Sequence, residues 1–251
     1  MIGMVCMLLM LSTGYTTLCA RVTGRRPHLD TLNKSSGAYD KTLLNKFLLV
    51  CKTVDPNART YTITGTISSL DKALPAKKME NVPFVLCKKE GQFYYRLGTT
   101  ETINGNGAYL YIDHKARRVM LSAQKQVADG NGLSGLTAIA ASLESENYKM
   151  NSMVKGDMQT ISMINEYHVS CKEYAVTFNR RTLAVKRVYV RLSNSGDPLS
   201  KDKEKVIDVR ITQWNTQADL SRYTSKNDMV KKDKYGWKMA PGYKSYKLVS
   251  M

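Results

Sequence analysis

Charge is missing from the first twenty residues of this 251-residue chain, although the whole sequence holds 38 Lys and Arg against 21 Asp and Glu. A long apolar run is missing too, because Met4–Leu11 is shorter than the roughly 20 apolar residues of a spanning helix. Basic residues follow from Arg21. The pattern predicts an export signal over 1–20 and a flexible lead-in over 21–37, with an uncleaved anchor as the alternative. We therefore expect a mature chain without a transmembrane span in the periplasm or cell envelope of a Gram-negative bacterium.

Patterns that accompany enzymatic chemistry are also missing. Histidine occurs only at His28, His114 and His168, and no serine lies in the Gly-flanked turn of a hydrolase nucleophile. The sequence GNGLSG at 130–135 matches a dinucleotide-binding pattern, but 149–156 does not read as the buried strand that such a site needs. The carboxylates are scattered along the chain. We therefore expect no catalytic residue, no metal and no cofactor.

Cysteine is scarce once the signal is removed, which leaves Cys51, Cys87 and Cys171. Their wide spacing matches no zinc pattern. Apolar residues precede each of them, so the sequence predicts buried small side chains rather than reactive thiols. Whether two of them form a disulfide is left open.

Positive charge is what the chain has in excess, with a net charge of +17 and a pI near 9.6. Such a balance favours anionic partners: lipid head groups, acidic polysaccharide or nucleic acid. For an exported chain we rank the envelope surface, or a protein partner on it, above nucleic acid. The basic aromatic tail, 229–251, interleaves lysines with tyrosine and tryptophan, which favours a C-terminal strand or cap with packed aromatics and solvated lysines over a segment that stacks nucleic-acid bases. We expect three of its lysines, called the tail lysines here, to contact an anionic surface: Lys231, Lys232 and Lys234.

Hydrophobic periodicity predicts a mainly β (α+β) domain over 38–228. Apolar residues recur every three or four positions in 38–54, which indicates an amphipathic N-terminal helix. Alternation then predicts strands, which form a curved antiparallel sheet in sequence order. Asn104-Gly105 and Asn106-Gly107 are competing hairpin turns. Helices are expected at 136–147 and 159–167, within a helical insertion at about 128–168. The expected strands are 61–67, 82–88, 92–97, 108–113, 119–122, 173–179, 182–194 with a bulge near Lys186-Arg187, and 205–214.

The helix at 38–54, the strand Tyr61–Ile67 and the meander Phe93–Ser122 together resemble the lipoprotein-carrier (LolA/LolB-like) fold. The resemblance implies an open half-barrel around an apolar cavity, with helices as a lid. It also implies binding of a lipid or other amphiphile without chemistry. An ordinary filled core is the alternative to a cavity. Strand alternation would place nine residues on the concave face: Ile63, Ile67, Phe93, Tyr95, Leu97, Leu110, Ile112, Val119 and Leu121.

Two further functions fit the same sequence. The protein could be a structural or assembly component of an envelope machine that docks a partner through its basic surface. An enzyme that acts on acidic glycan is the other, and it would need a His or carboxylate whose substitution abolishes turnover.

Overall fold

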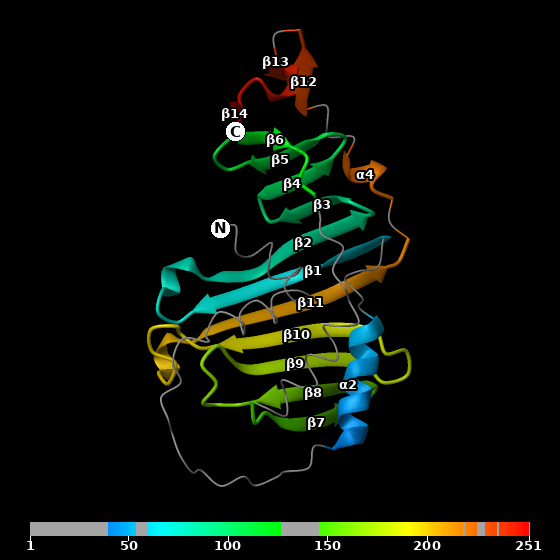
Figure 1. Ribbon diagram of the computed structural model, residues 1–251, viewed down its shortest axis with the longest axis vertical. Helices are drawn as coiled ribbons and strands as arrows, with labels where there is room; N and C mark the ends of the chain where they lie inside the picture. The colour runs from blue at the N-terminus through cyan, green and yellow to red at the C-terminus, as the bar shows by residue number, and fades with distance from the viewer. Residues whose placement is uncertain are drawn as a thin grey trace. The chain divides into compact units, whose positions relative to one another are not determined.

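A computed structural model describes residues 40–53, 60–126, 146–217, 219–224, 229–234 and 236–250 (Figure 1). The expected signal at 1–20, the lead-in at 21–37 and nearly all of the expected helix at 136–147 lie outside these residues. Within the described ranges, no helix is long and apolar enough to cross a membrane.

The fold is mainly β, as the periodicity predicts. Within the described ranges, twelve strands hydrogen-bond in the order β14-β6-β5-β4-β3-β2-β1-β11-β10-β9-β8-β7, and the sheet is open, with β14 and β7 at its ends (Figure 1). Strands β2 to β6 and β7 to β10 pair antiparallel, whereas β14 pairs with β6 in parallel. The strands are β1 Thr60–Asp71, β2 Met79–Lys89, β3 Gln92–Leu97, β4 Thr100–Gly105, β5 Ala108–Asp113, β6 Arg118–Ala123, β7 Lys149–Lys155, β8 Met158–Ile164, β9 Cys171–Asn179, β10 Val185–Leu192, β11 Lys205–Asn215 and β14 Lys247–Ser250.

The described residues form two compact units. Unit 1 contains 40–53, 69–78 and 146–208, and unit 2 contains 60–68, 79–126 and the described part of 209–250. Helix α2, Lys41–Thr53, and strands β7 to β10 belong to unit 1. Strands β2 to β6, the short helix α4 (Ser221–Thr224), the hairpin of β12 (Val230–Asp233) with β13 (Gly236–Met239), and β14 belong to unit 2.

Helix α2 lies where the amphipathic pattern predicts a helix. Asp40 caps it, because its Oδ1 accepts hydrogen bonds from the amides of Thr42 at 2.9 Å and Leu43 at 3.1 Å. The buried face of the helix presents Phe47, whose ring meets that of Tyr174 edge to face at 6.1 Å. The helix therefore covers one face of the unit 1 strands.

Two backbone details resolve questions that the sequence raised. Asn106 and Gly107 both have positive φ, at 52° and 79°, so Asn106-Gly107 forms the hairpin turn between β4 and β5. The register of β9 and β10 shifts between Val185 and Arg187, which confirms the bulge expected near Lys186.

The helical insertion is corrected at its C-terminal end, where 149–155 and 158–164 are strands β7 and β8. Burial along β8 alternates strictly, with Gln159, Ile161 and Met163 inward and Thr160 and Ser162 only partly buried. This period of two belongs to a strand. The remainder of the expected insertion, 127–145, lies outside the described residues.

Candidate functional site

The strand register of unit 2 divides the nine expected cavity residues between opposite faces of the sheet. Phe93 pairs with Asn104, whereas its neighbour Tyr94 pairs with Ile103, which in turn pairs with Leu110. Paired residues share a face and consecutive residues alternate. Phe93 and Leu110 therefore point to opposite sides, and the nine residues do not line one concave surface.

One of these faces is a filled core. Leu110 pairs with Leu121, and Ile112 pairs with Val119, and all four side chains are at most 2% exposed. They pack in one cluster with residues from the C-terminal part of the chain: Leu220, Met229 and Val230. These four candidates are thus core residues, and the basic tail completes the core instead of extending from it.

The other five candidates lie on the opposite face. Phe84 pairs with Leu97, so these two residues share this face. A Cβ on Gly65 of β1 would lie 2.8 Å from the Phe84 ring. Gly65 and the other odd-numbered residues of β1 therefore lie on the same face as Leu97. We call this surface the aromatic face. It carries Ile63, Ile67, Lys88, Phe93, Tyr95, Leu97, Tyr109, Tyr111 and Met120.

The aromatic face is less completely covered than the core face. Ile63, Ile67 and Tyr95 are each 4% exposed, whereas Phe93 and Leu97 are half-buried. Three half-buried members of this face are absent from the nine residues expected there: Tyr109, Tyr111 and Met120. Once Asn106-Gly107 is taken as the turn, the register pairs Asn104 with Tyr109 and places Thr102, Tyr111 and Met120 in one row, which is the signal that could have found all three.

Polar contacts fix one end of the aromatic face. The buried Asn104 amide donates to the carbonyl oxygens of Gly91 at 3.2 Å and Lys125 at 3.0 Å, and its Oδ1 accepts from the Lys125 amide at 2.8 Å. The Lys125 ammonium lies 3.9 Å from the centroid of the Tyr109 ring, a cation–π contact. A shallow hollow lined by Gly91, Gln124, Lys125 and Gln126 opens at this end.

The tail lysines lie in and beside the β12–β13 hairpin. Lys231 and Lys234 are exposed, and Lys231 pairs with Lys238 across the hairpin. Like charges that face one another in this way raise the local positive potential.

A chain of polar contacts joins the core face of unit 2 to its C-terminal strand. The buried Glu101 carboxylate accepts from the Tyr94 hydroxyl at 3.0 Å and contacts His114 Nε2 at 3.0 Å. His114 Nδ1 lies 2.8 Å from the Tyr246 hydroxyl, just before β14 begins. This contact fixes the imidazole between a carboxylate and a phenol.

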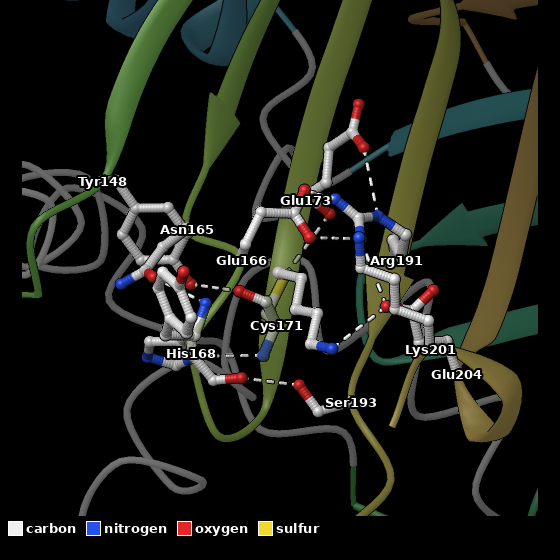
Figure 2. A network of polar contacts seen from close by, with 12 residues as sticks. Tyr148, Asn165, Glu166, His168, Cys171, Glu173, Arg191, Ser193, Lys201 and Glu204 are labelled. Carbon is white, nitrogen blue, oxygen red and sulfur yellow. Dashed lines mark hydrogen bonds and ion pairs between the residues drawn. The ribbon is translucent and has the colours of Figure 1, made fainter. Parts of the chain in front are cut away.

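A network of ion pairs surrounds Glu204 in unit 1 (Figure 2). Its carboxylate is 3% exposed and contacts three cations: Lys72 Nζ at 3.0 Å, Lys172 Nζ at 3.0 Å and Arg191 Nη1 at 3.2 Å. Burial opposes ionisation, but the hydrogen bonds from Lys72 and Lys172 and the charge of Arg191 lower the Glu204 pKa to about 2. Arg191 also binds Glu173 at 3.2 Å and Glu166 at 2.9 Å. The charges balance one another.

His168 lies beside the same network, close to Cys171 (Figure 2). Its Nδ1 accepts backbone hydrogen bonds from Ser170 at 3.2 Å and Cys171 at 3.0 Å, so the proton resides on Nε2, 3.0 Å from Glu146. Burial raises the Cys171 pKa to about 12, which keeps the sulfur protonated. The arrangement holds the turn before β9 in place.

Comparisons with known proteins add little to this geometry. No protein-family model matches the chain, and no curated protein matches it. Among 38 matching chains of solved structures is an uncharacterized conserved protein from Thermus thermophilus, with a TM-score of 0.39 and 9% identity over 81% of this chain and 98% of the other. A likeness this low carries no argument. Within the described part of the chain, no group of three or more His, Cys, Asp or Glu could hold a metal ion.

Proposed function

We propose that this protein is an exported, non-catalytic binding protein whose aromatic face holds the apolar part of a lipid or other amphiphile. The observation that carries the proposal is the contrast between the two faces of the unit 2 sheet. The core face is closed by the C-terminal residues, whereas the aromatic face keeps several large apolar side chains half-exposed. Covering such side chains with an acyl chain gains about 25 cal/mol per Å².

The open sheet is consistent with the open half-barrel that the carrier-like resemblance implies. The absence of charge in 1–20 supports export. N-terminal sequencing of protein extracted from the envelope should find a chain that begins near Arg21, and an intact Met1 would contradict export.

Uptake of an apolar fluorescent probe tests the binding proposal. Leu97→Lys and Met120→Lys should each weaken uptake severalfold, because a charge on the aromatic face opposes an apolar ligand. Ala123→Lys is the matched control, since Ala123 is exposed, lies at the end of β6 and points to the other face. Unchanged uptake in both aromatic-face variants would refute the proposal. Leu110→Lys is unsuitable here, because it would destroy the filled core.

A second candidate, docking within an envelope assembly, rests on strand β7 in unit 1. Met153 and Val154 on this strand are 66% and 51% exposed, and no described strand pairs with its outer backbone edge, so this edge suits an added strand. Antiparallel pairing of two β7 strands about Ser152 would set Lys149 against Lys155 twice. Like charges oppose self-pairing and favour an acidic partner strand.

Affinity purification from the envelope tests this docking. A specific partner should be lost from Met153→Asp, which adds a negative charge to the edge. It should remain with Leu199→Asp, because Leu199 is equally exposed, at 67%, but lies outside the strands. Retention of every partner by both variants would refute docking through β7.

A further inference from the structure

Lys88, in β2, is buried where a lysine is seldom buried. Only 4% of its surface is exposed, no described residue forms an ion pair or hydrogen bond with its ammonium, and the nitrogen is not among the fully buried atoms, so it keeps access to the surface. Lysine is almost never fully buried unless it is paired, because an isolated ammonium loses its hydration in an apolar site. The next residue, Lys89, points to the opposite face of the strand and is exposed to solvent.

Tyr95 provides a second unpartnered polar group on the same face. It is 4% exposed, and its hydroxyl has no hydrogen-bond partner among the described residues. Burial raises its pKa to about 12, so the hydroxyl keeps its proton and can donate it to a hydrogen bond.

The register brings these two side chains together. Lys88 pairs with Phe93, and Leu86 pairs with Tyr95, so Lys88 and Tyr95 are diagonal neighbours on the aromatic face. Their Cα atoms are about 7–8 Å apart in such a pair, a separation that long side chains bridge. Lys125, over the ring of Tyr109 in the same row of side chains as Lys88, adds a second positive charge to this end of the face.

We propose that Lys88 and Tyr95 form an anion-binding site that takes one phosphate or carboxylate group. The ammonium supplies the charge and the phenol donates a hydrogen bond, so one oxyanion satisfies both groups at once. The group is either a free anion or the head group of an amphiphile on the aromatic face. Only the second source rests on the function proposed above.

Calorimetric titration distinguishes these sources with three ligands: inorganic phosphate, dodecyl phosphate and the uncharged dodecyl maltoside. If the anion is a head group, dodecyl phosphate should bind at least ten times more tightly than dodecyl maltoside. If a free anion is the ligand, inorganic phosphate alone should bind saturably. If neither anion binds, the site does not exist. If both dodecyl ligands bind equally, the amphiphile proposal stands and the anion site fails.

Lys88→Met tests the residue assignment, with Lys89→Met as the control that removes the same charge from the opposite face. The Lys88 variant should lose about 10- to 100-fold in affinity for the anionic ligand, because it loses a charged hydrogen bond, and should keep its affinity for dodecyl maltoside. Tyr95→Phe should lose about three- to tenfold. Equal losses in the Lys88 and Lys89 variants would overturn the assignment.

Discussion

Glu204→Gln offers the sharpest test of the energetics of unit 1. The substitution keeps the shape of the side chain but removes the negative charge that faces Lys72, Lys172 and Arg191. A folded-state pKa of about 2 against an ordinary value of 4.5 corresponds to about 3 kcal/mol of stability at neutral pH. Removing one partner from a buried ion pair costs about 3–5 kcal/mol, which agrees. We expect the free energy of unfolding to fall by about 3 kcal/mol at pH 7.

The pH dependence of this loss identifies its cause. Because the folded pKa of Glu204 is depressed, its stabilisation is complete above about pH 5 and is lost as the pH falls toward 2. The difference between wild type and Glu204→Gln should therefore shrink as the carboxyl becomes protonated. Urea unfolding followed by circular dichroism at pH 7, 5 and 3 measures it.

An exposed ion pair in the same unit provides the control. Asp197 binds Lys203 at 3.0 Å, and both side chains are about half exposed, so Asp197→Asn should cost less than about 1 kcal/mol. A Glu204→Gln cost that stays the same from pH 7 to pH 3 would show that packing, not charge, explains the loss. If Glu204→Gln lowered the free energy of unfolding by no more than Asp197→Asn does, the buried network would be no more stabilising than an exposed ion pair, and the reasoning would be refuted.

Three further predictions concern other parts of the chain. Gly65→Ala should destabilise the protein by about 3 kcal/mol in thermal or urea unfolding, because a Cβ there would lie 2.0 Å from the Arg210 carbonyl oxygen; an unchanged midpoint would refute this close approach. Cys87 and Cys171 should react with iodoacetamide only on unfolding, since burial raises both thiol pKa values; rapid labelling of the native protein would contradict this. Adhesion of the protein to anionic vesicles should fall between 0.1 and 1 M salt, because the Debye length shrinks from about 10 to 3 Å. Replacing the tail lysines with glutamine should also weaken this adhesion. Adhesion that does not depend on salt would argue against an electrostatic contact.

Local pattern was enough to predict much of the fold. The spacing of apolar residues located helix α2 to within a few residues, and alternation located most strands. The strand β8 was missed because Met158–Ile164 also presents apolar residues at a spacing that a short helix tolerates. Only pairing with β7 and β9 decides between the two, and pairing is a long-range property.

The candidate site was only half predictable, and β3 shows why. Its sequence, QFYYRL, has aromatic residues at both parities, so alternation cannot say whether Tyr94 or Tyr95 faces the core. Packing by the C-terminal part of the chain decides which tyrosine faces the core. Tyr223, 129 residues further along the chain, stacks on Tyr94 with the ring centroids 4.7 Å apart. Lys88 escaped notice for a related reason, since a lysine at the end of a strand is usually solvated.

The discontinuity of unit 2 has a consequence for the order of events in biosynthesis. Its core combines β4 to β6 with Leu220, Met229 and Val230, and β14 pairs with β6 in parallel only after the last residues have been made. Closing this core therefore requires contacts across more than 100 residues, a costly loop closure that slows folding. The apolar face of β4 to β6 therefore stays uncovered until residues up to 250 have been synthesised, which is a long interval during which this face is open to other apolar partners.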